Sequence, residues 1–353
     1  METSAIDQAR AAEFAPETTY LETAHCGLLP RRTVEAVKAL AEENATGRGT
    51  GMGSAEAVEA ARADFAGLVG VAPDRVANGG SVAAHVALVA ASLPSGSEVL
   101  APEGDFSSVV SPFAVRGDLK MRYVPLAALA EAVRPGTALV AFSAVQSSDG
   151  RIADLDAIRA AAAGYGARTL LDASQAAGWL PLDAGAYDYT VTGAFKFLLC
   201  PRGTSFLTVT EQAQEDLRVL YAGWMSAAEP WQSTYGPVGR LAASARRFDE
   251  PTSFLAYHGA AQSLALLAGI GTTALHAHAT GLAARFRVGL AGIGHEAWPG
   301  ESAVVAVPGL GEREAELARA GVRVSNRAGN LRAAFHLYNT EADVDRALDV
   351  LSG

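Results

Sequence analysis

Two residues in the sequence, Asp172 and Lys196, combine side chains and surroundings that could carry out chemistry. Asp172 ends the apolar run 169–172, which predicts a buried parallel strand whose carboxyl end presents the carboxylate, where open α/β sheets place their sites. Lys196 lies between Phe195 and Phe197. Burial among apolar groups lowers the pKa of a lysine, so the neutral amine that attacks an aldehyde becomes accessible. The alternative is a structural lysine whose stem lies along apolar surface.

A second candidate site lies at the start of a strongly apolar segment. A short strand leads into Asn78, Gly79, Gly80 and Ser81, and a helix is expected to begin at Val82. The N-terminus of a helix presents unpaired N–H groups and a partial positive charge, and small residues let a ligand approach the backbone. The pattern predicts a phosphate site, but many helices that bind no ligand begin in the same way.

The residues that follow Asp172 form a more specific, ordered set: Gln175, Gly178, an aspartate-containing strand at 187–192, Lys196, Pro201 and Gly203. This order resembles the core signature of the class V aminotransferase family, which uses pyridoxal 5′-phosphate. The family includes cysteine desulfurases, kynureninase, isopenicillin-N-epimerase-like proteins and several carbon–sulfur lyases. The resemblance extends over residues 19–351, almost the whole chain.

The resemblance implies that pyridoxal 5′-phosphate is the cofactor and that Lys196 is the catalytic residue, which holds it as a Schiff base. Asp172 would pair with the protonated pyridine nitrogen and make the ring an electron sink. Phe106 would stack on the ring, and Gln175 would donate to the phenolic oxygen. The other cofactor-binding residues that it implies are Gly80, Ser81, Val82, Gln146 or Ser147, Thr192 and Thr252.

Three positions around the phosphate depart from the family pattern. Val82 replaces the usual hydroxyl residue, so Ser81 is expected to supply the side-chain contact. Gly193 and Phe195 stand where many relatives have Ser and His before the lysine, and Thr192 is the nearest hydroxyl that could substitute. We therefore expect fewer side-chain contacts to the phosphate than in the relatives.

The resemblance also implies a substrate side and a partner subunit. Arg332 opens the segment 332–343, similar to the closing motif of the family, in which the arginine binds a substrate carboxylate with its planar fork. The entry turn at 19–30 holds His25 and Cys26, either of which could face the substrate; packing is the alternative role. Thr252 would reach the phosphate of a second subunit, which implies a homodimer with composite sites.

The alternation of strands and helices from about residue 76 to 172 predicts right-handed crossovers and a mainly parallel sheet. The expected fold class is α/β, the type I fold of PLP-dependent transferases, with helices on both faces of the sheet and a small α+β C-terminal domain. We expect an N-terminal extension at 1–18, a large cofactor-binding domain at 19–255, whose first segment could join the small domain, and linker helices with the small domain at 256–353. The glycine-rich run 46–54 predicts a loop beside the site or a plain linker.

The composition limits the partners. With 28 Lys and Arg against 38 Asp and Glu, the net charge is −10, which disfavours nucleic acid and anionic membranes. No run approaches the ~18 apolar residues that span a bilayer, so we expect a cytoplasmic protein. Cys26 and Cys200 fit reduced thiols. His276, His278 and His295 lack ligand-like partners, so no metal site is expected.

The expected function is that of a class V aminotransferase acting on an amino acid. The interval 325–330 before Arg332 holds no cysteine, which argues against persulfide-forming desulfuration. Carbon–sulfur β-elimination and epimerisation are alternatives, because all three reactions need α-proton removal by Lys196. A non-catalytic scaffold of the same fold is an alternative of another class. A nicotinamide oxidoreductase is disfavoured because no strand-linked dinucleotide glycine pattern occurs.

Overall fold

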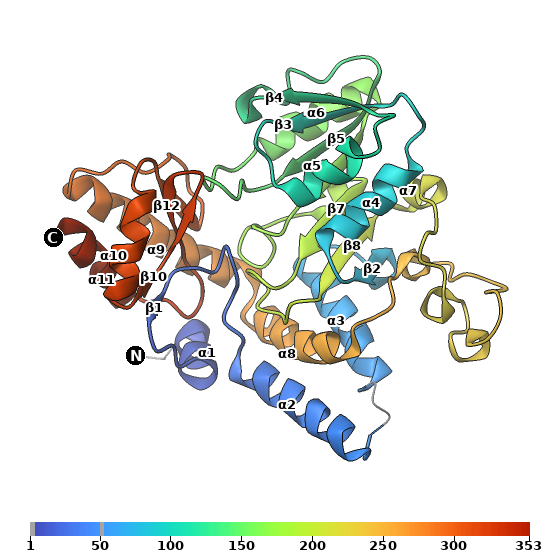
Figure 1. Cartoon of the computed structure of the whole chain (residues 1–353), viewed down its shortest axis with the longest axis horizontal. Helices are drawn as coiled ribbons and strands as arrows, with labels where there is room; N and C mark the ends of the chain where they lie inside the picture. Colours follow the sequence, from blue (N-terminus) through green and yellow to red (C-terminus); the bar gives the residue numbers. More distant parts are fainter. Residues whose placement is uncertain (1–3, 50–52) are drawn as a thin grey trace.

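The computed structural model describes residues 4–49 and 53–353. Figure 1 shows a larger part built on a twisted sheet and a smaller part that contains the C-terminus. In the larger part, a seven-stranded sheet has the order β2-β8-β7-β6-β5-β3-β4. Its strands are β2 (Val76–Gly79), β3 (Glu98–Pro102), β4 (Lys120–Val124), β5 (Thr137–Ser143), β6 (Arg168–Asp172), β7 (Tyr189–Gly193) and β8 (Ser205–Val209).

Strand direction brings the chemistry to one edge of this sheet. The five strands β7, β6, β5, β3 and β4 pair with their neighbours in parallel. Strand β8 runs antiparallel to both of its neighbours, β7 and β2. In the register of β6, Asp172 lies beside Ser143 of β5 and Val191 of β7. Because parallel strands end at the same edge, the carboxylate of β6 and the loop that follows β7 meet there. The predicted mainly parallel α/β sheet is confirmed.

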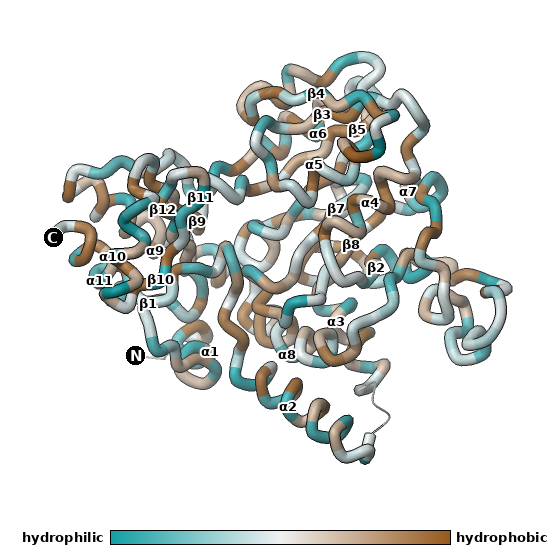
Figure 2. The backbone as a smooth tube through the Cα atoms, in the orientation of Figure 1, coloured by the Kyte–Doolittle hydropathy of each residue, from teal (hydrophilic) through white to brown (hydrophobic). Residues whose placement is uncertain are grey.

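Alternating strand residues contribute to two apolar layers, one on each face of the sheet. Val140 and Phe142 of β5 belong to one cluster, whereas Leu139 and Ala141 belong to the other. Figure 2 shows these hydrophobic strands and the packed helices in brown. The helices of the larger part are α3 (Ala55–Leu68), α4 (Val82–Ser92), α5 (Ser107–Ala114), α6 (Leu155–Tyr165), α7 (Glu211–Asp216) and α8 (Phe254–Ile270).

The smaller part has a three-stranded antiparallel sheet in the order β11-β12-β9. A third apolar cluster, which includes Leu21, Phe286 and Phe335, lies beneath its helices. The elements are α9 (Thr272–Gly292), β9 (Val304–Val307), α10 (Glu314–Arg319), β10 (Val322–Arg323), β11 (Ser325–Arg327), β12 (Asn330–Ala334) and α11 (Glu341–Ser352). This is the small α+β layer that the sequence predicted.

The N-terminal segment lies against both parts. Strand β1 (Thr19–Tyr20) pairs in parallel with β10, so the chain after helix α1 (Ala5–Glu13) begins in the smaller part. It then passes to the larger part through α2 (Arg31–Thr46), which packs on α8. The glycine-rich run follows α2, and residues 50–52 of it lie outside the described residues. No helix in the described ranges is both long and apolar enough to cross a bilayer.

The loop between β11 and β12 carries a left-handed alanine. Ala328 and Gly329 have φ of 50° and 79° and connect the paired residues Arg327 and Asn330. Two positive φ angles define a turn that prefers Asn-Gly, and alanine there costs about 1–2 kcal/mol. We expect Ala328→Asn to raise the free energy of unfolding by about 1 kcal/mol and the thermal midpoint by roughly 2 °C. Ala328→Val should lower both, and an unchanged midpoint in both variants would contradict the strain.

Candidate active site

Lys196 lies in the loop after β7 and is 7% exposed. Its Nζ is 5.0 Å from the ring centre of Phe106 and 5.9 Å from that of Phe195. Burial, helped by the charges of three arginines, lowers the pKa of Lys196 to about 8, whereas the charge of Asp172 opposes this shift. About one tenth of the amine is therefore neutral at pH 7, far more than for a lysine with the ordinary pKa of 10.5, and the neutral form is what a nucleophile or base requires.

Two glycines let other segments approach the backbone of the lysine loop. A Cβ on Gly27 would lie 2.2 Å from the carbonyl oxygen of Lys196. A Cβ on Gly178, whose φ is +100°, would lie 2.9 Å from the carbonyl oxygen of Phe197. Leu199, in the same loop, has a φ of 54°, a strained value for a leucine. The loop is thus held by close packing on two sides.

Asp172 is buried at the carboxyl end of β6, with its Oδ1 accepting a hydrogen bond of 2.8 Å from the N–H of Ser174. Burial raises its pKa, and the charge of Lys196 works in the opposite direction. In the described part of the chain, no cationic side chain forms a salt bridge with this carboxylate. An acid of this kind suits a cationic group brought by a ligand.

The anion cup, defined as Gly80, Ser81 and Val82, lies at the N-terminus of α4. Ser81 caps the helix by accepting from the N–H of Ala84, and its hydroxyl hydrogen stays available to a ligand. A cavity of about 240 Å³ joins the cup to Lys196. Its lining also holds hydroxyl residues that the sequence reasoning missed, because their position depends on loop packing: Ser108, Ser174 and Thr204.

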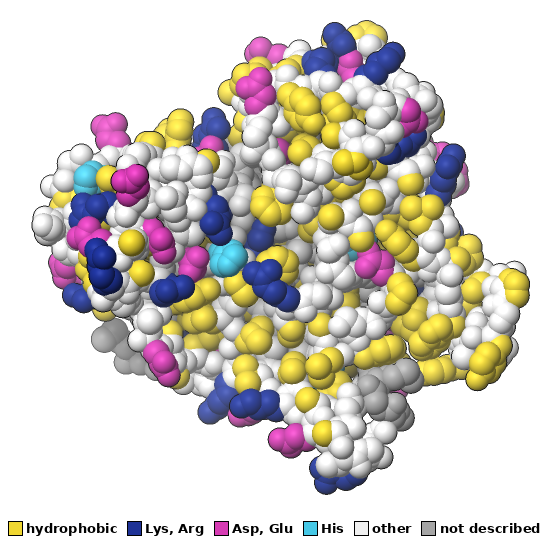
Figure 3. Space-filling model, in the orientation of Figure 1, with side chains coloured by type: hydrophobic (Ala, Val, Ile, Leu, Met, Phe, Trp, Pro, Cys, Tyr) yellow, Lys and Arg dark blue, Asp and Glu magenta, His cyan; other side chains and the backbone are white. Residues whose placement is uncertain are grey.

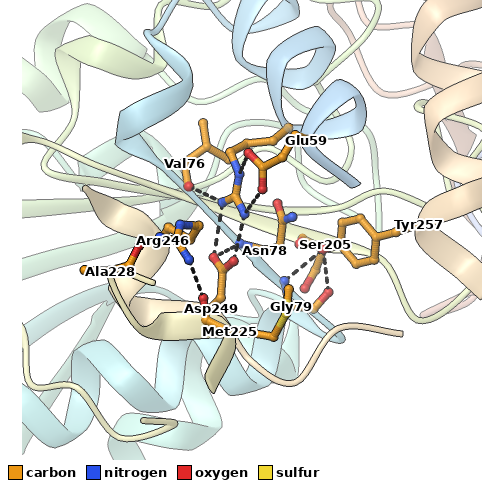
Figure 4. Close-up of polar contacts among 11 residues, drawn as sticks. Glu59, Val76, Asn78, Gly79, Ser205, Met225, Ala228, Arg246, Asp249 and Tyr257 are labelled. Atoms are coloured by element: carbon orange, nitrogen blue, oxygen red, sulfur yellow. Dashed lines mark hydrogen bonds and ion pairs between the residues drawn. The ribbon is translucent and has the colours of Figure 1, made fainter. Parts of the chain in front are cut away.

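A buried ion pair holds the end of strand β2, which leads into the cup (Figure 4). Arg62 of α3 is 3% exposed and pairs through both terminal nitrogens with Asp249, at 2.7 and 3.1 Å. Asp249 Oδ1 also accepts from the N–H of Asn78, and Tyr257 Oη accepts from the N–H of Gly79. The strand end that leads into the cup is therefore fixed by the chain after residue 245. The sequence reasoning gave Arg62 and Asp249 no role.

Gln146, Thr192 and Thr252 line neither of the two cavities that contain Lys196. Gln146 donates to Asp105, which also accepts from Ser143, so its amide holds two strand ends together. The hydroxyl oxygens of Thr192 and Thr252 are buried without a partner among the described residues. Their contacts to the cofactor stay predictions.

A second cavity, of about 310 Å³, opens on the other side of Lys196. We call it the arginine pocket, and its lining residues are Ala24, His25, Phe106, Ser147, Phe195, Lys196, Arg202, Arg327 and Arg332. Figure 3 shows basic side chains and a histidine gathered in the hollow between the two parts of the molecule. Phe106, which is 43% exposed, lines both cavities, as do Phe195 and Lys196.

Arg332 lies deep in the arginine pocket, on β12. Its Nε donates to Ser325 Oγ, and one terminal nitrogen donates to the carbonyl and hydroxyl oxygens of Ser147. Gln175 donates to Ser147 Oγ at 3.2 Å and to the carbonyl of Ala24 at 2.9 Å. Since the donors of Gln175 are used by these oxygens, donation to a ligand would require one contact to change.

The structure therefore brings together most of the predicted site residues: Lys196, Asp172, Gln175, Ser147, Phe106, His25, Arg332 and the anion cup.

The fold and this arrangement define the class of protein: an α/β protein of fold type I. The cysteine desulfurase CsdA of Escherichia coli superposes with a TM-score of 0.85, at 20% identity, over 99% of this chain and 98% of that chain. The cystine C–S lyase C-DES, solved with cysteine persulfide, gives 0.84 at 22% identity, over 95% and 97%. These likenesses establish the fold.

The chain belongs to the class V aminotransferase family, whose members are PLP-dependent enzymes, because the family model described as Aminotransferase class-V matches residues 19–347. The uncharacterized aminotransferase YcbU of Bacillus subtilis is 28% identical, over 84% of each chain. Isopenicillin N epimerase of Amycolatopsis lactamdurans is also 28% identical, over 95% of each. The family predicted from the sequence is confirmed, and these relatives differ in reaction.

Proposed function

We propose that this protein is a PLP-dependent aminotransferase that acts on an amino acid through Lys196. The observation that carries the proposal is the placement of one buried, easily neutralised amine between two cavities. One cavity ends in the anion cup, and the other holds Arg332. This arrangement gives a phosphorylated aldehyde and an amino-acid carboxylate separate binding sites on opposite sides of the same nitrogen.

The residues present fit the cofactor. Ser81 offers a hydroxyl and the first turn of α4 offers N–H groups to the phosphate. Asp172 lacks a salt-bridge partner in the described chain and would hold the pyridine nitrogen in its protonated form. The face of Phe106 would limit the tilt of the ring. When bound, pyridoxal 5′-phosphate supplies the electron sink that stabilises negative charge at the substrate carbon.

Each side chain at the site then has a separate role in the proposed reaction. Arg332 binds the substrate carboxylate with its planar fork, and Ser147 holds the arginine in that orientation. Lys196 Nζ takes the proton from the carbon that bears the amino group, since its lowered pKa leaves a neutral amine available. Phe106 and Phe195 flank that nitrogen and exclude water from it.

An amino-acid panel scored for 2-oxo acid, with and without an amino acceptor, tests this proposal. Product that accumulates only with acceptor means amino transfer. Pyruvate and ammonia released without acceptor would mean β-elimination, and loss of optical activity alone would mean epimerisation. Protein that stays colourless with added pyridoxal 5′-phosphate would contradict the proposal and favour a non-catalytic scaffold.

The reaction of apoprotein with the cofactor aldehyde should depend on pH through Lys196. We expect the rate to rise about tenfold per pH unit below pH 8 and to level off above it, as stopped-flow absorbance would show. A lysine with the ordinary pKa of 10.5 would give a rate that still rises at pH 9 to 10.

The same lowered pKa affects stability. Between about pH 8 and 10.5, the amine of Lys196 is mostly neutral in the folded protein and mostly protonated in the unfolded chain. Lys196 therefore disfavours folding below pH 8, and the free energy of unfolding rises as the pH increases from about 8 to 10.5.

Glu250 places a competing carboxylate at the anion cup. Its Oε2 accepts from the N–H of Gly80 at 2.8 Å, and its Oε1 is buried without a partner among the described residues. Burial raises its pKa, although the contact with Gly80 opposes this. We expect Glu250→Gln to bind pyridoxal 5′-phosphate about tenfold more tightly, because one negative charge near the phosphate is removed. Titration of apoprotein would measure this, with exposed Glu35→Gln as the control; equal affinities would contradict it.

We also propose a homodimer in which Thr252 contributes to the site of the second subunit. The support is its buried hydroxyl, which lacks a partner among the described residues and lies outside both cavities. Sedimentation at micromolar concentration tests the assembly, and loss of cofactor affinity in Thr252→Ala tests the contribution. A monomeric protein that retains full cofactor affinity would contradict both. A cytoplasmic location stays a prediction.

A further inference from the structure

The arginine pocket holds more positive charge than one substrate carboxylate needs. Arg202, Arg327 and Arg332 all line it, and no acidic residue does. Throughout residues 4–49 and 53–353, none of these three guanidinium groups forms a salt bridge. Glu22, which does not line the pocket, interacts electrostatically with both Arg327 and Arg332, but it lies nearest to Arg323, at 3.9 Å. The pocket is therefore built to receive negative charge from a ligand.

Arg332, which lies deep in the pocket, is already assigned to the α-carboxylate of the substrate. Arg332 is 1% exposed, and Ser325 and Ser147 fix its orientation. Burial, and then the neighbouring charge of Arg327, lowers the pKa of Arg332 to about 10. A single planar fork binds a single carboxylate. Binding of the α-carboxylate at Arg332 leaves the guanidinium groups of Arg327 and Arg202 without an anion.

Arg327 is held at the pocket by its hairpin. The amide of Asn330 donates to the carbonyl of Ser148, at 3.3 Å, and to that of Arg327, at 3.0 Å, which ties the hairpin to the larger part. A terminal nitrogen of Arg327 lies 3.3 Å from His25 Nδ1. Since a guanidinium only donates, Nδ1 accepts, and His25 Nε2 carries the hydrogen and adds a donor at the mouth.

Arg202 lies on the other side of the mouth. Its guanidinium carbon is 4.4 Å from the ring centre of Phe195, so the aromatic face fixes the plane of the fork. Arg202 and Arg327 both act on the charge of Lys196 and of His25, which places them within electrostatic range of the same cavity. The cofactor phosphate does not account for them, because the anion cup opens into the other cavity.

We propose that the substrate is an amino acid whose side chain carries a second anionic group, such as a carboxylate, and that Arg327 and Arg202 bind that group. The inference rests on the proposed function, because it assigns Arg332 to the α-carboxylate. A neutral side chain at this point would leave both guanidinium groups without an anion in the pocket, whereas an anion supplies a counter-charge and gains charge-assisted hydrogen bonds.

Calorimetric titration of the holoprotein with unreactive acids tests the pocket separately from the chemistry. Succinate and glutarate are compared with butyrate and valerate, which have the same chain lengths and one carboxylate. We expect the better dicarboxylate to bind about 10- to 100-fold more tightly than its monocarboxylate. Arg327→Gln and Arg202→Gln should each reduce this ratio about tenfold, and Arg319→Gln, on the exposed surface of α10, should leave it unchanged.

A kinetic experiment compares L-aspartate and L-glutamate with L-asparagine and L-glutamine as substrates. We expect kcat/KM for the better acid to exceed that of its amide at least about 100-fold, because only the acid brings a second negative charge to Arg327 and Arg202. Equal binding of dicarboxylates and monocarboxylates, or a ratio that survives both arginine variants, would overturn the inference. Holoprotein that produces 2-oxo acid only from neutral amino acids would overturn it as well, yet keep the proposed function. Colourless protein would instead overturn the proposed function.

Discussion

Lys196→Ala should fail to form a borohydride-stable adduct with pyridoxal 5′-phosphate and should lose at least about 10³-fold in kcat/KM. The expected loss is large because Lys196 both attaches the cofactor and moves the substrate proton in the proposed mechanism. Lys196→Arg should behave in the same way, since a guanidinium keeps the charge but supplies no neutral amine at ordinary pH. Mass spectrometry of the reduced protein and steady-state kinetics would measure the two losses.

The small number of lysines in the sequence limits the alternative attachment sites for the cofactor. The chain contains three lysines, Lys38, Lys120 and Lys196, and the first two are exposed. Lys120→Ala, on strand β4, is therefore the matched control and should leave both adduct and activity unchanged. An adduct on Lys38 or Lys120 in the wild-type protein, or activity retained by Lys196→Ala, would rule out the assigned lysine.

Asp249→Ala should lower the free energy of unfolding by about 3–5 kcal/mol, because it leaves the guanidinium of Arg62 buried without its main partner. The same change frees the N–H of Asn78, at the strand end that leads into the anion cup. We therefore expect weaker binding of pyridoxal 5′-phosphate even at temperatures where the variant stays folded. Urea unfolding and cofactor titration would measure the two effects.

Glu59→Ala provides the control for this pair. Glu59 also pairs with Arg62, at 3.1 Å, but its side chain is 56% exposed. Removing an exposed partner should cost at most about 1 kcal/mol and should leave cofactor affinity unchanged. Similar losses in Asp249→Ala and Glu59→Ala would show that burial does not set the strength of this ion pair.

Local patterns in the sequence were sufficient to predict the fold and the centre of the site. The apolar run that ends at Asp172 predicted a buried strand, and the ordered resemblance to the family selected Lys196 as the Schiff-base lysine over the structural alternative. Parallel strands then bring their carboxyl ends to one edge, so the two residues had to meet. The glycine and serine before α4 likewise predicted the position of the anion cup.

Residues whose position depends on loop packing could not be assigned in this way. The sequence offered Gln146 and Thr192 as polar groups near the cofactor, but neither lines the cavities that contain Lys196. Ser174 and Thr204 line the cup instead, from turns whose path is set by contacts distant in the sequence. Asp249, the buried partner of Arg62, lies 187 positions from it in the sequence, so their pairing could not be read from a local pattern.

The sequence by itself determined the family, the mainly parallel sheet and the identity of the buried lysine, because each depends on residues that are neighbours along the chain. Tertiary structure alone decided that Arg202, Arg327 and Arg332 share one pocket without an acid, since they come from a loop of the larger part and from two strands of the smaller part. It also decided that Glu250 faces Gly80 across 170 positions of sequence. Charge balance within a cavity depends on which distant side chains meet, and a linear pattern does not contain that information.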